Sequence, residues 1–296
     1  MKLTKLNYRD MKLDGRRMSG NVDDRRGVSG AKIAGGGIVG IIIAAVITFL
    51  SGGDIFDVVS QVAPQVIQNA GQADYTPTEH EEELAVFAKK ILAGTEDVWT
   101  EEFRKIGREY EAPRLVLFTG SVNSGCGGAT AATGPFYCSA DQTVYIDLSF
   151  FEQMEKEMGA GGDFAFAYVI AHEVGHHVQY LLGTLQQAHN QMNRVSKSES
   201  NQISVRLELQ ADYYAGVWAY HDNRLYNSLE PGDIEEGLNA ASKIGDDYLQ
   251  KQAQGYAVPD TFNHGRSDQR VRWLRKGATS GSLTGGDTFS QSYSTL

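Results

Sequence analysis

Two histidines separated by three residues, inside a strongly apolar stretch, constrain this chain more than any other feature. His172 and His176 belong to the sequence H-E-x-x-H, in which Glu173 follows the first histidine. On a helix, residues four apart share one face, with their Cβ atoms about 5–6 Å apart. Both imidazoles could then reach one metal ion, with the glutamate beside it as a potential general base. The motif therefore predicts a zinc site of the hydrolytic type.

The residues around the motif predict a helix from Phe164 to Tyr180. Apolar and small residues recur there at helical spacing, and no proline interrupts them. Gly161 and Gly162 break the chain before this segment, and Asp163 is a suitable N-cap. The alternative is a pair of surface histidines on an amphipathic helix. The segment is too apolar to favour that alternative.

A hydrolytic zinc site needs a third protein ligand and an open position for water. In one class of such sites the motif continues to a third histidine, but this chain has Leu182 at that position and Gln179 where the class requires glycine. The other common solution is a glutamate on a second helix, followed four residues later by an aspartate. Glu208 and Asp212 fit this pattern. We expect Glu208 to bind zinc and Asp212 to accept a hydrogen bond from a ligand histidine.

Alternatives exist for these side chains. Glu208 and Asp212 could be an ordinary acidic pair on an exposed helix, although their apolar neighbours indicate burial, and a buried carboxylate requires a partner. His177 follows the second predicted ligand directly and points about 100° around the helix from it. We expect His177 to be a packed or hydrogen-bonded histidine, not a ligand.

Several sequence blocks occur together in one known family. They are Gly125-Cys126-Gly127, Gly134-Pro135-Phe136-Tyr137-Cys138, Val144-Tyr145-Ile146-Asp147-Leu148, His172-Glu173-Val174-Gly175-His176-His177-Val178-Gln179, Glu208-Leu209-Gln210-Ala211-Asp212 and His264-Gly265. Together they resemble the neutral zinc metallopeptidases of bacteria, which are related in their core to the glutamate-zincins. The resemblance implies a zincin-like peptidase fold with a strand edge beside the active-site helix. It also marks His172, His176 and Glu208 as zinc ligands and Glu173 as catalytic.

The chemistry expected of such a site can be assigned to residues. Zinc would activate a water, and Glu173 would take its proton and pass it to the leaving amine. The developing oxyanion needs a further donor. His264 is the first candidate because it resembles a histidine block after the ligand helix in related peptidases; a helix-capping or surface histidine is the alternative. Tyr213 or Tyr214 could serve instead. The strand at 143–148 could present its edge to an extended peptide.

The expected partner is therefore a peptide or protein substrate. The competing interpretation is a non-catalytic, zinc-binding scaffold or interaction protein, and a vestigial peptidase fold is a third. Glu173 argues against a structural zinc site, because such a site needs no base and usually fills its fourth position with cysteine or histidine.

The rest of the pattern predicts one α+β domain, mainly helical with a small sheet, over residues 78–276. Segments 113–118 and 143–148 are strand-like, and Thr78 with Glu81 makes a potential capping box. Residues 52–77 are expected to be a juxtamembrane linker, and residues 277–296, rich in glycine, serine and threonine, a flexible tail. Helices are expected from Thr78 onward and over 96–108, 162–182, 198–221, 233–253 and 267–276.

The N-terminal part predicts a membrane anchor. Residues 1–32 carry nine Lys/Arg and four Asp, a net charge of +5, and residues 33–51 form an uncharged run of 19 residues. That length is close to the ~20 residues of a helix that crosses a bilayer. A cleaved signal peptide or a buried core helix are the alternatives. The basic segment before the span predicts a cytoplasmic N-terminus and an extracytoplasmic catalytic domain.

Charge and cysteines agree with that placement. Subtracting the +5 of residues 1–32 from the whole-chain −10 leaves −15, which disfavours nucleic acid as a partner. Cys126 and Cys138 are 12 residues apart, and nothing near them completes a four-ligand metal site. Outside the cytoplasm they would form a disulfide; two free buried thiols are the alternative. Closing a loop of roughly 13 residues could stabilise the fold by about 3 kcal/mol.

Overall fold

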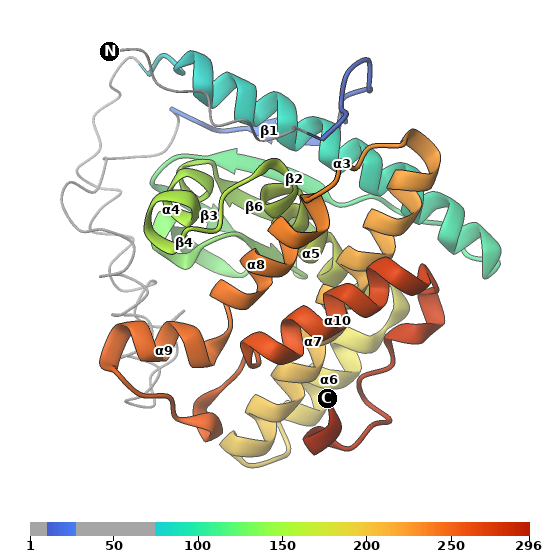
Figure 1. The fold of residues 1–296 in the computed structure, drawn as a ribbon. Helices are drawn as coiled ribbons and strands as arrows, with labels where there is room; N and C mark the ends of the chain where they lie inside the picture. Colours follow the sequence, from blue (N-terminus) through green and yellow to red (C-terminus); the bar gives the residue numbers. More distant parts are fainter. Residues whose placement is uncertain (1–10, 28–74) are drawn as a thin grey trace.

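The computed structural model describes residues 11–27 and 75–296. The predicted membrane span at 33–51 and most of the predicted linker at 52–77 lie outside the described residues. Within the two described ranges, no helix combines the length and the apolar character needed to cross a bilayer. These ranges form an α+β fold in which helices predominate (Figure 1).

Eight α-helices make up most of the described chain. They are α3 (Glu79–Lys105), α4 (Ser149–Met158), α5 (Asp163–Leu182), α6 (Thr184–Met192), α7 (Lys197–Tyr226), α8 (Asp233–Lys243), α9 (Asp246–Gln254) and α10 (Ser267–Ser280). The predicted capping box of Thr78 and Glu81 begins α3, which runs on as one helix where two were expected. The helix expected over 233–253 is instead divided into α8 and α9. Gly245 lies at the division, where a Cβ atom would come within 2.4 Å of the Ser267 nitrogen.

A four-stranded sheet lies beside the helices. Its order is β1-β2-β6-β5, in which β1, β2 and β6 are parallel and β5 is antiparallel to β6. The strands are β1 (Val22–Asp24), β2 (Arg114–Phe118), β5 (Phe136–Cys138) and β6 (Thr143–Asp147), and a separate hairpin consists of β3 (Ser121–Ser124) and β4 (Gly127–Thr130). The prediction that strand 143–148 presents a free edge is wrong, because β6 is paired on both sides and β5 is the edge strand.

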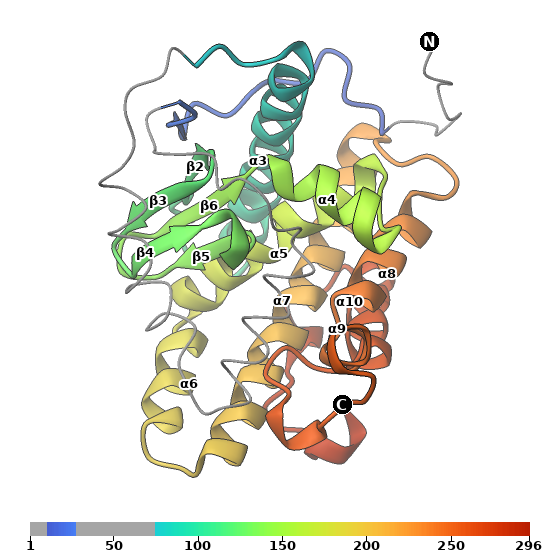
Figure 2. The same cartoon turned by 90° about the vertical axis from the view of Figure 1, so that its left-hand side faces the viewer.

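The sheet has two different faces. One face contributes Leu115, Leu117, Val144 and Ile146 to the main core, which also includes residues of α3, α5 and α7. The opposite face carries Val116, Phe118 and Tyr145, which pack with Val122 and Ala129 of the hairpin. Figure 2 shows the strands on one side of α3 and α5, with α8 and α10 on the other side. Cys126, in the hairpin turn, is joined by a disulfide to Cys138 at the end of β5.

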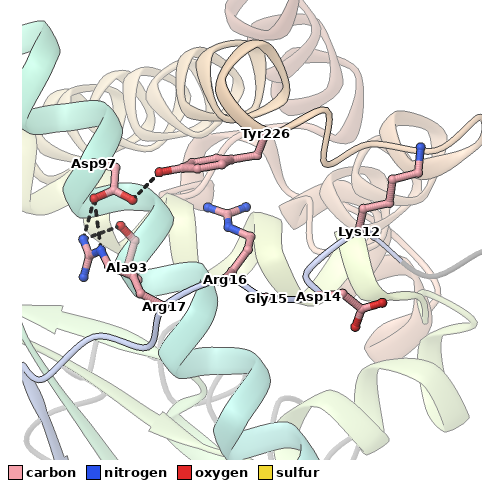
Figure 3. A pocket seen from close by; sticks show the side chains of 8 residues that line it. All are labelled: Lys12, Asp14, Gly15, Arg16, Arg17, Ala93, Asp97 and Tyr226. Carbon is pink, nitrogen blue, oxygen red and sulfur yellow. Dashed lines mark hydrogen bonds and ion pairs between the residues drawn. The ribbon is translucent and has the colours of Figure 1, made fainter.

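Residues 11–27 belong to this same folded body. β1 pairs in parallel with β2, and Met11 and Leu13 are buried in the main core. Arg16 makes two hydrogen bonds, of 2.8 and 2.7 Å, to the Asp222 carboxylate of α7. Arg17 pairs with Asp97 of α3, which also accepts a hydrogen bond from a tyrosine hydroxyl at the end of α7 (Figure 3). The N-terminal segment is thus fixed to the sheet and to both helices.

The C-terminal residues are also packed. Helix α10 continues to Ser280, beyond the predicted end at residue 276. Residues 281–296 then cross α7, and Thr288 and Leu296 are 0 % and 1 % exposed. Arg206 of α7 donates hydrogen bonds to the Thr288 and Gln291 carbonyls. The flexible tail predicted for residues 277–296 is therefore replaced by a short helical end and an ordered segment, because these hydrogen bonds and buried side chains hold it against the domain.

Candidate metal centre

Helix α5 carries the H-E-x-x-H motif through the centre of the fold. It begins at Asp163 with Gly162 as the N-cap, one residue earlier than the predicted N-cap Asp163 implied. Gly175, inside the motif, faces α7 so closely that a Cβ atom would lie 2.9 Å from the Ala211 carbonyl oxygen. Only a residue without a side chain permits this approach. The contact brings the turn of α7 that carries Glu208 and Asp212 against the motif.

Three side chains meet between these two helices. Potential ligand atoms of His172, His176 and Glu208 all lie within 4.8 Å of one another. One Glu208 oxygen is 3.3 Å from Nε2 of His172, and the other is 3.4 Å from Nε2 of His176. Two imidazole nitrogens and one carboxylate are a donor set that suits Zn²⁺ and leaves a fourth position for water. The predicted ligand residues are thus brought together, and their chemistry fits the metal.

His172 is oriented by a buried charge cluster. Its Nδ1 lies 2.8 Å from Asp212 Oδ1, so an N–H at Nδ1 can donate to the carboxylate and leave the Nε2 lone pair toward Glu208. Asp212 also accepts a 2.6 Å hydrogen bond from the Tyr168 hydroxyl. Two guanidinium nitrogens of Arg270 donate to its two oxygens at 2.9 Å. Burial alone would raise the pKa of Asp212, but Arg270 and His172 outweigh burial and hold that pKa below its ordinary value.

His176 has a neutral partner instead. Its Nδ1 lies 2.9 Å from Gln179 Oε1, one helical turn later on α5. The Gln179 amide nitrogen donates to the Leu207 carbonyl at 2.7 Å and to Gln210 Oε1 at 3.1 Å. Gln179 is 0 % exposed. The sequence offered a signal for this residue, because positions three apart on a helix are neighbours. It offered none for Arg270, which lies 58 positions from Asp212.

Glu173 remains without a partner. It is buried on α5, 8 % exposed, and its carboxylate makes no hydrogen bond or ion pair with the rest of residues 11–27 and 75–296. Its oxygens are not among the fully buried atoms that lack a hydrogen-bond partner in these residues, so the carboxylate keeps some access to solvent. An unengaged carboxylate next in sequence to a potential metal ligand is available to accept a proton.

His264 is held in place by Asp246. Its Nδ1 is 3.1 Å from Asp246 Oδ1, and the backbone N–H groups of His264 and Gly265 donate to Asp246 Oδ2 at 2.7 and 2.9 Å. A Cβ atom on Gly265 would lie 3.3 Å from Val205, one turn before Glu208 on α7. The His264 side chain is 45 % exposed; partial desolvation lowers its pKa, but the Asp246 and Glu208 charges outweigh that effect, and the net shift is upward. His264 therefore lies on a fixed loop within electrostatic reach of Glu208.

The two tyrosines proposed as alternative oxyanion donors lie in different surroundings. The Tyr213 hydroxyl lies 2.7 Å from Ser280 Oγ and donates to the Ser282 carbonyl at 2.6 Å, in the C-terminal segment. Tyr214 is 4 % exposed and packs edge-on against Trp99 in the core. The Tyr213 hydroxyl is therefore not a free donor, and the Tyr214 ring is held in the core.

His177 joins the metal-binding helix to the edge strand. Its Nδ1 lies 2.9 Å from the Tyr137 hydroxyl of β5, and its Nε2 lies 2.7 Å from the Glu111 carbonyl. The backbone carbonyl can only accept, so the ring proton is on Nε2 and Tyr137 donates to Nδ1. Burial lowers the pKa of His177 to about 4. The expectation of a packed, hydrogen-bonded histidine is confirmed, and β5 is fixed beside α5.

Several known proteins are similar to this chain. A family model described as "Putative neutral zinc metallopeptidase" matches residues 11–289. The uncharacterized protein YpfJ of Escherichia coli is 45 % identical over 289 residues, which cover 95 % of this chain and 100 % of that protein. An uncharacterized protein of Mycobacterium tuberculosis is 44 % identical over 191 residues, 61 % of this chain and 64 % of its own length. No solved structure matches. The chain belongs to the neutral zinc metallopeptidase family.

Proposed function

We propose that this protein is a zinc-dependent peptidase that hydrolyses peptide bonds in a peptide or protein substrate. The observation that carries the proposal is the combination on α5 and α7 of three converging ligand residues and one unengaged carboxylate. His172, His176 and Glu208 have the donor types of a three-ligand zinc site, and Glu173 has no other partner. A structural site would not need an unengaged glutamate with access to solvent beside its ligands, so catalysis accounts for the arrangement better.

Each residue has a distinct role in this reaction. Zinc, when bound, lowers the pKa of a water and polarises the substrate carbonyl. Glu173 accepts the proton of the attacking water and delivers it to the leaving amine. His264, oriented by Asp246, donates a hydrogen bond to the oxyanion that develops on the substrate carbonyl. Asp212 holds the His172 ring in the tautomer that leaves Nε2 free for the metal.

The substrate chain would bind along β5. The sheet order makes β5 an edge strand, and its Tyr137 is hydrogen-bonded to His177 of α5. An extended peptide that adds to this edge would run beside the helix that carries the metal ligands. This proposal is new for β5, since residues 143–147, for which strand addition was expected, are paired on both sides.

The contacts of the N-terminal segment bear on the membrane topology of the protein. We infer that residues 11–27 and 75–296 share one compartment, in place of the expected topology with the N-terminus and the catalytic domain on opposite sides. The β1–β2 pairing supports this, because strands separated by a bilayer cannot hydrogen-bond. Gly27 and Tyr75 also lie together: a Cβ atom on Gly27 would be 2.5 Å from the tyrosine ring. Membrane attachment through residues 33–51 stays a prediction.

The first test is Glu173→Gln in the full chain, with zinc content and cleavage of a mixed peptide library measured side by side. We expect about one zinc per chain in both proteins, and a loss of cleavage of at least about 100-fold in the variant, in line with general-base catalysis. Glu101→Gln is the matched control, because that glutamate lies on the exposed face of α3 and pairs with Arg104.

The outcomes separate the candidate functions. Zinc in both proteins with full cleavage by Glu173→Gln would remove Glu173 as the base. Zinc in both with no cleavage by either would favour the non-catalytic scaffold. Absence of zinc from the wild-type protein would overturn the site.

A further inference from the structure

Residues 281–296, called the C-terminal strap below, contact the helix that carries the third predicted metal ligand. The strap follows α10 and lies along α7, the helix that carries Glu208 (Figure 1). Arg206 donates to the Thr288 carbonyl, and the Thr288 hydroxyl donates back to the Arg206 carbonyl at 2.8 Å. Arg206 precedes Glu208 by two residues. The strap is therefore anchored on the same turn of α7 as the third predicted metal ligand.

The strap approaches α7 closely because of its glycines. A Cβ atom on Gly285 would lie 2.1 Å from the Tyr213 hydroxyl, and one on Gly286 would lie 2.6 Å from Cδ1 of the same ring. No real side chain tolerates those distances. The glycine content of this segment, which in sequence suggests flexibility, here permits a tight contact.

A chain of hydrogen bonds leads from the strap to His176. The Gly286 carbonyl accepts from Gln210 Nε2 at 2.8 Å, Gln210 Oε1 accepts from Gln179 Nε2 at 3.1 Å, and Gln179 Oε1 lies 2.9 Å from His176 Nδ1. A backbone carbonyl can only accept, so Gln210 must present its amide nitrogen to Gly286 and its oxygen to Gln179. Gln179, whose amide nitrogen also donates to the Leu207 carbonyl at 2.7 Å, presents its oxygen to His176, which must carry its proton on Nδ1.

That proton position matters for the metal. With the proton on Nδ1, the Nε2 lone pair of His176 is free and faces Glu208, 3.4 Å away. Without the strap, Gln210 loses the acceptor that fixes its orientation. A flipped Gln210 would turn its amide N–H groups toward the amide N–H groups of Gln179. Such partners of a ligand histidine set its tautomer and ring orientation, and with them the affinity for the metal.

We propose that the C-terminal strap is a positioning element of the metal centre, acting on His176 through Gln210 and Gln179. The inference rests on the proposed function, since it requires that a metal bind at His172, His176 and Glu208. Gln179 and Gln210 touch neither metal nor substrate in this scheme. They fix the tautomer and the orientation of the His176 imidazole ring, which binds the metal.

The test measures zinc affinity of the full-length protein by competition with a chromophoric chelator. Gln179→Leu, Gln210→Leu and Gly286→Ala should each weaken zinc binding, Gln179→Leu by roughly tenfold, the lower end for loss of a ligand's hydrogen-bond partner. Gly286→Ala changes a residue of the strap only, and its new methyl group would meet the Tyr213 ring of α7 and push the strap away from that helix.

Gln250→Leu is the matched control. Gln250 is a buried glutamine of α9, 3 % exposed, that also bridges two groups, Thr261 Oγ1 and the Val258 N–H. Its loss should lower the melting temperature and leave zinc affinity at the wild-type value. A general loss of stability would instead weaken zinc binding in all four variants alike.

The double variant Gln210→Leu with Gly286→Ala gives the sharpest readout. If the strap acts through Gln210, the second substitution adds little to the effect of the first on zinc affinity, whereas independent sites give additive effects. Additive effects, or wild-type affinity in Gln179→Leu, would overturn the inference while leaving a zinc-binding wild-type peptidase intact. A wild-type protein that binds no zinc would overturn the proposed function itself.

Discussion

At the scale of single residues, the site depends on a buried arginine that faces two carboxylates. Arg270 is 3 % exposed, binds both oxygens of Asp212 and lies 3.7 Å from a Glu208 oxygen. Two buried carboxylates without a nearby cation would be costly, because desolvation penalises each charge. Arg270 offsets that cost before any metal binds, and it keeps Asp212 ionised and able to accept from His172.

Replacement of Arg270 by Met should destabilise the protein strongly. Removing one partner of a buried ion pair typically costs about 3–5 kcal/mol, and we expect the free energy of unfolding in urea to fall by that order. Arg272→Met is the matched control on the same helix, because Arg272 is half exposed and pairs with the exposed Asp268. That control should change stability by less than about 1 kcal/mol.

The stability that the Arg270–Asp212 pair contributes depends on pH, and the direction of that dependence follows from the pKa of Asp212. The pKa of Asp212 is below its ordinary value in the folded protein, so its contribution to stability is present above the unfolded carboxyl pKa. The contribution is lost as the pH falls through the lower folded pKa. Equal stabilities of Arg270→Met and Arg272→Met at neutral pH would contradict the role assigned to Arg270.

At the scale of elements, α5 and β5 are held together by His177. The imidazole is 0 % exposed and lies between the Tyr137 hydroxyl and the Glu111 carbonyl, and its burial disfavours the charge that a second ring proton would bring. Its two contacts fix the distance between the edge strand and the metal-binding helix. The position of β5 relative to α5 therefore defines where an extended substrate could lie.

The buried neutral state of His177 predicts a pH effect on stability. Its pKa falls from 6.5 to about 4 on folding, so between these values the unfolded chain binds the extra proton. Stability should therefore fall as the pH drops from 6.5 to 4, by about 3 kcal/mol at most. His177→Leu should lack this part of the acid destabilisation in urea titrations at several pH values. His80→Leu, at an exposed position of α3, should retain it. Identical pH profiles for His177→Leu and wild type would contradict this assignment.

At the scale of the whole molecule, residues 11–27 close the fold from the N-terminal side. They add β1 to the sheet and place Arg16 against Asp222, where the side chains are 7 % and 1 % exposed. Gly94 of α3 makes room for this pair, since a Cβ atom there would lie 2.5 Å from the Arg16 guanidinium. The buried pair could not form if a bilayer separated the two segments.

This arrangement predicts the labelling pattern of two single-cysteine variants. Gly20→Cys and Thr279→Cys introduce thiols at exposed positions of the N-terminal segment and of α10, while Cys126 and Cys138 are already bonded. A membrane-impermeant maleimide applied to intact cells and to lysed cells should label both variants alike in each sample. Labelling of only one of the two in intact cells would restore the topology with a single crossing between them.

The sequence by itself determined the local part of the site. His172, Glu173 and His176 occupy one helix, and Glu208 and Asp212 another, because helical spacing fixes which side chains share a face. The apolar residues around both segments indicated that these faces are buried. The tertiary structure confirms that convergence, since the close approach at Gly175 makes the two faces meet.

The tertiary structure alone decided which groups support that site. Arg270 and the Gln210 link to Gly286 are brought to it by contacts between residues 58 and 76 positions apart, and the N-terminal strand joins the sheet by pairs 93 positions apart. Periodicity carries no information over such separations, because it reports the face of one element and not its partner. For the same reason, the glycines of residues 281–296 led to the prediction of a flexible tail. Their close contact with Tyr213 exists only once α7 and α10 have packed.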